Sequence, residues 1–451
     1  MHMEEEGAAT RFLHDDEDCL EEYDNVKESA IFGSSLTPPA LPGLSDGNRR
    51  ADPHPPSWVL LDVSAYIAGG DDDAADTTAR SRTRGGHAIE ATMIAARSPL
   101  GPGADVLKIH VRVHCPGLKP TRFATEPRIF AAADGLFLLG VVIGHRSLCT
   151  QPDMFDYFVY QPAARWLTLL PHPDGRFGLR DVTLLRCSPN SSSYIIAFLE
   201  GTRGMAYELH RFHSKSSTWT MNKLELAPTA INPALDSVFF CTSKVFTLGG
   251  GDGGGFVGWA DLWRGVLLCD VLLDDPELRY IPLPHPFRER KWDAVITRDI
   301  AVVGQGCIKY VDKRSDEHSV GGWTVTAWSK KIVSRQPWKE EPWRQDYELR
   351  SSDVSVLLPP LPKPFHVLMT GHPVISLRGD DVVYLMSKES LRDDTAWVVA
   401  VDMRSKSLQE VVAFGGAGRS MGISRTCIQS RIPVIFRTFW KTSEWCGVNC
   451  N

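Results

Sequence analysis

The stretch VLLCDVLLDDPELRYIPLP, residues 266–284, decides the fold of this 451-residue chain. The apolar run Val266–Cys269 ends at an acidic residue, passes through the polar turn Asp274–Pro276 and resumes as Leu278–Pro284. Short runs of branched, aromatic and other apolar residues, separated by Asp and Pro, predict two strands joined by a turn. The same kind of hairpin recurs elsewhere in the chain.

Three further segments repeat this arrangement of strand, polar turn and strand. Their first strands contain Tyr160, His210 and Asp402, and the first strand of the opening stretch ends at Asp270. The steps between these positions are 50, 60 and 132 residues, and the last is long enough for two units. Repeats of about 50 residues built from short strands are typical of propeller blades of the kelch type.

Amphipathic helical patterns are nearly absent between the strand-like runs, so the sequence predicts an all-β protein. We expect a β-propeller-like domain of about six irregular blades, because one small sheet cannot bury its apolar faces alone. A pair of double-sheet β-sandwiches, or a partial propeller, is the alternative.

The charge of the chain is unevenly distributed. Residues 1–28 hold eleven Asp/Glu and two Lys/Arg, a charge of −9, whereas the whole chain carries −6. Prolines and glycines follow, and this composition predicts a disordered leader over 1–55. We expect the propeller-like domain over 56–430 and a C-terminal tail over 431–451. The acidic leader is either a docking tail for a basic partner or a solvated extension.

Composition also restricts the class of protein. The near-neutral charge outside the leader argues against a strongly basic nucleic-acid binder, and no apolar run is long enough to span a membrane. Ten scattered cysteines indicate thiols in a reducing compartment. With no signal-peptide pattern at the first residues, we expect a cytoplasmic or nuclear protein.

One motif, residues 256–287, is more specific than the repeats around it. Within it, residues 259–272, WADLWRGVLLCDVL, followed by Leu278–Pro284, resemble the plant domain of unknown function 1618 family. The weaker resemblance of other segments extends over most of 56–415. The family is similar in repeat style to kelch-like and F-box-associated plant proteins, and the resemblance implies a fold and a kingdom but no catalytic residues. Residues 1–55 show no apolar helical pattern that resembles an F-box.

The residues of this motif also have a direct physical interpretation. Asp261 and Arg264 are close enough in sequence to form an ion pair that holds the turn, and Gly265 permits a tight bend before the next strand. Asp270 begins a second turn, where its short polar side chain satisfies backbone donors. We therefore predict a structural role for six residues: Trp259, Asp261, Trp263, Arg264, Gly265 and Asp270.

The sequence offers no pattern for catalysis. It contains no nucleophile elbow, no zinc-binding His pair and no phosphate-binding loop, because the glycine-rich segment 249–255 is not followed by Lys and Ser or Thr. We accordingly predict no catalytic residues, no metal site and no cofactor.

Residues 287–350 are the best candidate for binding, because tryptophans and tyrosines alternate there with arginines and lysines. Trp, Tyr and Arg dominate the binding energy of protein interfaces. The predicted partner-binding residues are Trp338, Trp343, Arg335, Arg344 and Tyr347. Tryptophans packed between blades, with a solvated insertion, are the competing interpretation.

We therefore expect a non-enzymatic interaction module that binds an unknown protein partner through propeller loops, with no role for a membrane. The sequence does not define the oligomeric state. Two alternatives remain open: an enzyme, hydrolytic or sugar-acting, with its site at the propeller axis, and a binder of single-stranded nucleic acid. Acidic residues within 287–350 weaken the nucleic-acid alternative.

Overall fold

The computed structural model describes most of the chain between residues 58 and 431. The described residues are 58–67, 77–97, 107–144, 152–173, 175, 177–178, 180–188, 191–202, 206–226, 240–248, 255–284, 293–304, 306–315, 322–332, 341–354, 358–390, 395–415 and 427–431. The predicted leader, 1–55, lies outside them, and so does the predicted tail apart from Arg431.

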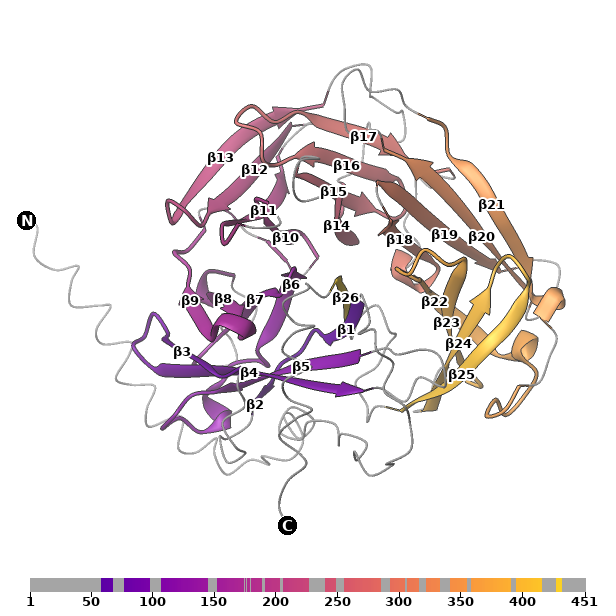
Figure 1. The fold of residues 1–451 in the computed structure, drawn as a ribbon, viewed down its shortest axis with the longest axis horizontal. Coiled ribbons are helices and arrows are strands. Elements are labelled where there is room, and N and C mark those ends of the chain that lie inside the picture. Colours follow the sequence, from indigo (N-terminus) through magenta and orange to yellow (C-terminus); the bar gives the residue numbers. More distant parts are fainter. Residues whose placement is uncertain are drawn as a thin grey trace, which may run out of the picture.

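Within these residues the strands form six sheets arranged in a ring (Figure 1). Five are four-stranded antiparallel sheets that follow the chain in order, and we call them blades 1 to 5. Blade 1 contains β6 (Arg128–Ala133), β7 (Leu136–Val141), β8 (Asp156–Gln161) and β9 (Trp166–Leu169). Blade 2 contains β10 (Val182–Arg186), β11 (Tyr194–Gly201), β12 (Ala206–His213) and β13 (Thr218–Glu225).

The next three blades repeat the pattern. Blade 3 contains β14 (Lys244–Leu248), β15 (Phe256–Asp261), β16 (Gly265–Asp270) and β17 (Leu278–Pro282). Blade 4 contains β18 (Arg298–Val303), β19 (Cys307–Ser315), β20 (Trp323–Lys331) and β21 (Arg344–Arg350). Blade 5 contains β22 (Met369–Ile375), β23 (Val382–Lys388), β24 (Thr395–Asp402) and β25 (Ser407–Gly415).

The sixth sheet, the closing blade, combines strands from the two ends of the described chain. Its order is β26-β1-β5-β4-β3, where β1 pairs antiparallel with β26 and parallel with β5. The short strand β2 also pairs with β5. The strands are β1 (Trp58–Asp62), β2 (Tyr66–Ile67), β3 (Ala79–Arg82), β4 (Ala88–Arg97), β5 (Leu107–His114) and β26 (Cys427–Arg431). Contacts of β26 with β6, and of β3 with β9, join this blade to blade 1.

The ring confirms the all-β, propeller-like prediction. Tyr160, His210, Asp270 and Asp402 each lie on the third strand of a blade, β8, β12, β16 and β24. The long step between the last two spans blade 4, whose third strand is β20. The irregularity lies in the closing blade, which has additional strands and parallel pairing. Helices among the described residues are short 3-10 turns: Pro120–Arg122, Pro152–Met154, Pro162–Ala164, Ala294–Ile296, Ser351–Val354 and Phe365–Val367.

Apolar side chains from consecutive blades pack together in five large clusters, one at each junction from the closing blade round to blade 5. Adjacent residues of one strand pack against different neighbouring blades: Leu267 packs toward blade 2 and Leu268 toward blade 4. All six residues of β16 are therefore buried, and its residues Val266–Cys269 form a continuous apolar run and not an alternating pattern.

The junction between blade 5 and the closing blade differs from the other five. The blade 5 face turned toward it carries a small apolar cluster of Val374, Met386, Ala396 and Val398, with Tyr384 beside it. None of the described residues of the closing blade belongs to this cluster. No helix in the described part of the chain has the length and apolar character needed to cross a membrane.

We expect the pairing of β1 with β26 to hold the ring closed. A chain that ends at residue 426 loses five paired residues of this ladder. At about 0.5–1.5 kcal/mol for each net hydrogen bond, the free energy of unfolding should fall by about 3 kcal/mol. Urea denaturation measures the loss. A chain that ends at residue 431 keeps β26 and is the matched control; equal stability of the two chains would contradict this role.

Candidate functional site

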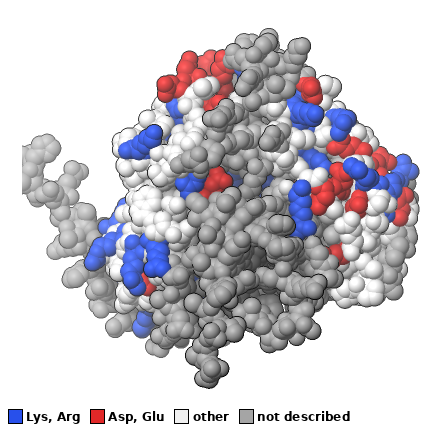
Figure 2. Space-filling model, in the orientation of Figure 1, with Lys and Arg blue, Asp and Glu red and all other residues white. Residues whose placement is uncertain are grey.

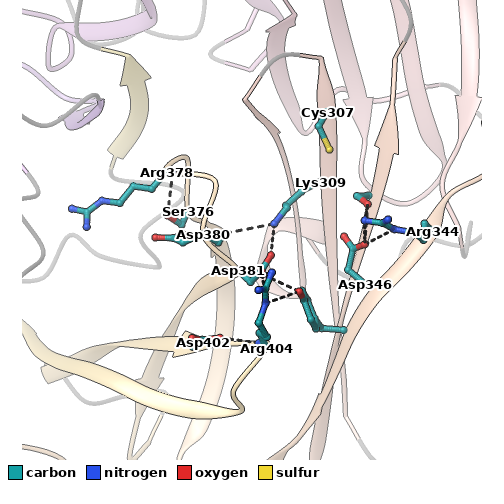
Figure 3. Close-up of polar contacts among 12 residues, drawn as sticks. Cys307, Lys309, Arg344, Asp346, Ser376, Arg378, Asp380, Asp381, Asp402 and Arg404 are labelled. Atoms are coloured by element: carbon teal, nitrogen blue, oxygen red, sulfur yellow. Dashed lines mark hydrogen bonds and ion pairs between the residues drawn. The ribbon is translucent and has the colours of Figure 1, made fainter.

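A cluster of charged and aromatic side chains bridges blades 4 and 5 at one rim of the ring (Figure 3). Lys309 lies on β19 and Tyr347 on the outer strand β21. Asp381 lies in the turn between β22 and β23, and Arg404 in the turn between β24 and β25. With Arg344, at the start of β21, these residues are named the rim cluster. The blade stacking therefore gathers four segments that are far apart in the sequence.

Asp381 is the centre of the rim cluster. Its Oδ1 atom receives the Lys309 ammonium at 2.9 Å, and its Oδ2 atom accepts the Tyr347 hydroxyl proton, also at 2.9 Å. The Arg404 guanidinium approaches the same Oδ2 atom at 2.7 Å. Two groups of blade 4 and one of blade 5 thus converge on one carboxylate, and charge-assisted bonds of this type are among the stronger ones in proteins.

Arg404 is held in place but remains open to solvent. Its Nε atom donates to the Tyr347 hydroxyl at 3.1 Å, and its guanidinium carbon lies 6.0 Å from the centre of that ring. Its side chain is nevertheless 73% exposed. Asp402 fixes the turn beneath it by accepting the backbone N–H groups of Arg404 and Ser405 at 2.8 and 3.0 Å.

Arg344 extends the rim cluster along the edge of blade 4. Its Nε atom donates to Asp346 at 2.9 Å, and the Ser329 hydroxyl donates to the same carboxylate oxygen at 3.0 Å. The Arg344 side chain is 79% exposed, while that of Asp346 is largely buried. The Arg344 guanidinium is therefore exposed to solvent while Asp346 holds it in place.

Two carboxyl groups of this region have lowered pKa values. Burial alone would raise the pKa of Asp381, but the hydrogen bonds from Lys309, Tyr347 and Arg404 outweigh it and lower the pKa. The pKa of Asp402 is lowered chiefly by the backbone N–H of Ser405. Both groups are charged at neutral pH, so the bridge between the blades is ionic.

The structure brings together two of the five predicted partner-binding residues, Arg344 and Tyr347. Trp343 is half-buried: its ring N–H donates to the Pro282 carbonyl of blade 3 at 2.8 Å, and the ring packs against the cluster between blades 3 and 4. Arg335 and Trp338 lie outside the described residues. Sequence reasoning missed Lys309, Asp381 and Arg404.

Elsewhere, polar side chains link the inner strands of the ring. Lys244 at the start of β14 contacts Asp299 of β18 at 2.6 Å, and Asp299 also accepts the backbone N–H of Ile375 on β22 at 2.9 Å. One carboxylate therefore connects blades 3, 4 and 5. Among the described residues, no three or more His, Cys, Asp or Glu side chains are grouped so that they could hold a metal ion.

The predicted structural motif forms the turn between β15 and β16. Asp261 pairs with the Arg264 guanidinium at 2.6 Å, as the sequence predicted, and both side chains are almost completely buried. The other Asp261 oxygen accepts the backbone N–H of Trp263 at 2.9 Å. The Arg264 carbonyl accepts the Tyr280 hydroxyl proton at 3.0 Å, which ties the turn to β17.

Both tryptophans of the motif contact neighbouring blades. The fully buried Trp259 donates its ring N–H to the Asp181 carbonyl, next to blade 2, at 2.8 Å. The guanidinium of Arg298, from blade 4, lies 4.8 Å from the centre of the Trp263 ring. It also donates to the Leu262 carbonyl at 2.8 Å. The motif therefore joins three consecutive blades.

Gly265 and Asp270 have different local roles. A Cβ atom on Gly265 would lie 2.6 Å from the Ile281 carbonyl oxygen and would collide with the Tyr280 ring, so close packing against β17 requires glycine here. This differs from the bend expected from the sequence. Asp270 accepts the backbone N–H groups of Gly255 and Leu272, both at 3.0 Å, at the turn predicted for it.

The motif and the strands that follow it match a known family model. Residues 259–384 match the family DUF1618, described as a protein of unknown function. The match begins at Trp259 and includes all of blade 4, with Lys309, Arg344, Tyr347 and Asp381 of the rim cluster. No curated protein matches the chain significantly.

Solved structures similar to this chain include propeller lectins. The six-bladed β-propeller lectin of Aleuria aurantia is 10% identical, with 81% of this chain and 97% of that chain covered and a TM-score of 0.32. A mutant of AofleA from Arthrobotrys oligospora is also 10% identical, with 83% and 90% covered and a TM-score of 0.33. An α-L-arabinofuranosidase of Podospora anserina, in complex with cellotriose, is 10% identical, with 74% and 91% covered and a TM-score of 0.25. At such TM-scores these likenesses carry no inference about function.

Breaking the buried pair of the motif should strongly destabilise the protein. Arg264→Met leaves the Asp261 carboxylate buried without its partner, which typically costs 3–5 kcal/mol, roughly, in the free energy of unfolding. Arg279→Met is the matched control in the same blade, because Arg279 pairs with the exposed Glu277 and such surface pairs contribute under about 1 kcal/mol. Urea denaturation of both variants tests this; similar small losses would contradict the structural role.

Asp381→Asn should make the protein less stable at neutral pH, by about 1 kcal/mol, because a partly exposed charged hydrogen-bond network contributes modestly. The folded-state pKa lies below the ordinary 3.8, so the stabilisation is present above that value and disappears as the pH falls below it. The difference from the wild-type protein should thus shrink below about pH 4. Denaturant titrations at neutral pH and below about pH 4 measure the difference in the free energy of unfolding. Asp275→Asn, on an exposed turn, is the control. A difference independent of pH would exclude the ionic bridge.

Proposed function

We propose that the protein is a non-enzymatic interaction module that binds a protein partner at the rim cluster. The observation that supports this is the presentation of Arg344 and Arg404, both more than 70% exposed, by side chains that hold them in place. Arginine and tyrosine are enriched among the residues that dominate protein interfaces. The rim cluster offers both types at one junction of the ring.

Preorganisation favours binding at this rim. A rotamer-rich side chain that becomes immobile on association costs roughly 0.5–1.5 kcal/mol. In the rim cluster much of this ordering is already present, because Tyr347 and Asp381 hold Arg404, and Asp346 holds Arg344. The exposed guanidinium groups can then form bidentate bonds to carboxylates or carbonyls of a partner.

The charge of the rim cluster favours a protein over a nucleic acid. Lys309, Arg344 and Arg404 are each paired with an aspartate, at Asp381 or Asp346. A phosphate backbone is bound mainly by unneutralised Lys and Arg, whereas protein interfaces combine both signs of charge. A partner with a mixed-charge surface fits this rim best.

We further propose that this module acts in the cytoplasm or nucleus of a plant cell, with blades of the kelch-like style. The reducing compartment agrees with the free thiols of the described cysteines Cys115, Cys187, Cys241, Cys269 and Cys307. The plant setting rests on the resemblance of the motif at residues 259–272.

Affinity capture from plant tissue tests the function. The wild-type chain and the variant Arg344→Ala/Arg404→Ala serve as baits, and captured proteins are compared by mass spectrometry. The variant should lose a protein that the wild type retains, and the purified pair should bind at least about tenfold more weakly, as expected when central interface residues are truncated. The variant should remain folded, with an unfolding temperature only slightly below that of the wild type, since exposed pairs such as those of these arginines contribute under about 1 kcal/mol each.

Lys215→Ala/Lys223→Ala is the matched control for this experiment. It removes the same charge from exposed positions on the β12–β13 hairpin of blade 2. If the rim and control variants capture the same proteins as the wild type with unchanged affinity, the rim is not the binding site. If a captured partner is converted chemically in the presence of the pure protein, the non-enzymatic part of the proposal is wrong.

A further inference from the structure

The closing blade has one apolar and one basic face. In its antiparallel ladder Arg80 lies opposite Glu90, and Glu90 lies opposite His114, so these three side chains share a face. Arg82 lies two residues beyond Arg80 on the same face, and Arg112 lies two residues before His114. The alternating residues point the other way and pack against blade 1: Ala79, Ile89, Ala91, Met93, Val111 and Val113.

We call the side that carries Arg80, Arg82 and Arg112 the basic face. Glu90 is the one acidic residue among the described positions of β3, β4 and β5. The positive charge extends beyond these strands, because residues 77–122 hold eight Lys/Arg and two Asp/Glu. Figure 2 shows Lys and Arg side chains gathered over β3, apart from the mixed charges around blades 4 and 5.

The outer part of the basic face is accessible. The Arg80 side chain is 75% exposed, and its contact with Glu90, at 2.6 Å, is a surface ion pair. Arg82 is also exposed and donates to the Gly86 carbonyl at 2.8 Å. Exposed contacts of this kind contribute little free energy, so both guanidinium groups can donate to a carboxylate of another segment with little loss.

The chain itself carries a segment of complementary charge. Residues 1–28 have a charge of −9, with the densest run at Asp15–Asp18. This segment is connected by residues 29–57 to β1, which lies in the closing blade and pairs with β5. Twenty-nine residues can span at most about 100 Å, and the five strands of the closing blade that lie side by side are only about 20 Å wide. Residues 1–28 can therefore reach the basic face.

We propose that residues 1–28 bind the basic face of the closing blade in the same chain. Covalent connection gives the segment an effective concentration on the order of a millimolar, which favours this contact over a free polyanion of similar charge. This contact is independent of the rim cluster, which lies at the junction of blades 4 and 5.

Limited proteolysis of the full chain with a protease that cleaves after glutamate tests the contact. Cleavage at Glu17 and Glu21 should be severalfold slower in the wild type than in Arg80→Gln/Arg82→Gln at about 50 mM salt. The difference should vanish near 1 M salt, where charges are screened beyond about 3 Å. Mass spectrometry of the released peptides gives both rates, and thermal unfolding verifies that the variant is folded.

Two matched controls define the site. Lys215→Gln/Lys223→Gln removes the same charge from blade 2, and cleavage should remain as slow as in the wild type. The second test changes the acidic segment: the variant Asp15→Asn/Asp16→Asn/Glu17→Gln should accelerate cleavage at Glu21. Its control removes the same charge from an exposed turn of blade 3, with Asp274→Asn/Asp275→Asn/Glu277→Gln. This control should leave the rate of cleavage at Glu21 unchanged.

Three results would overturn the proposal. Equal cleavage of the wild type and Arg80→Gln/Arg82→Gln at low salt would show that the basic face does not hold residues 1–28. Equal acceleration by the blade 2 control would show a diffuse charge effect. Protection that increases with protein concentration would assign the contact to a second copy of the chain, and therefore not to the same molecule.

Discussion

The structure depends on the burial of apolar sheet faces by neighbouring blades. A four-stranded sheet such as blade 3 has Leu267 on one face and Leu268 on the other, and neither face can be left in water. Stacking around a ring meets this requirement at five junctions with large apolar clusters. The DUF1618-like motif strengthens this packing where blade 3 meets its neighbours, because Trp259 and Trp263 contact blades on opposite sides.

Charged groups have a second role at the same junctions. Asp299 connects three inner strands, Arg298 connects blades 3 and 4, and Asp381 connects blades 4 and 5. Apolar packing alone permits sliding between smooth sheet faces, whereas a directional hydrogen bond fixes one relative position. The rim cluster is the most exposed of these links. We relate the binding role proposed for it to this position, because the contact that aligns two blades also holds Arg404 toward solvent.

Local signals made much of the fold predictable. Tight hairpins leave turn residues next to short apolar runs, so Tyr160, His210, Asp270 and Asp402 were all placed on equivalent strands. The Asp261–Arg264 pair was predictable for the same reason, since only three positions separate its partners. By contrast, β1 and β26 pair across more than 360 residues, and no local pattern encodes such a contact.

The candidate site shows the same limit. Arg344 and Tyr347 were predicted to bind from their residue types, but Lys309, Asp381 and Arg404 join them only because blades 4 and 5 are neighbours. Their turn and strand sequences are ordinary, so residue type alone gave no indication. Trp343 was predicted to bind, yet it packs between blades, because an aromatic residue is equally suited to a core and to an interface.

The closing blade combines strands that are far apart in the sequence, and this affects how the protein folds during synthesis. Its strand β1 leaves the ribosome well before its partner β26, which follows more than 360 residues later in the chain. At about 5–20 residues per second, roughly 20–75 s separate the two strands. During this interval β1 lacks its antiparallel partner and the ring is incomplete. The nascent chain therefore passes through a stage in which an unpaired sheet edge is exposed and can aggregate. We expect the chain to depend most on molecular chaperones at that stage.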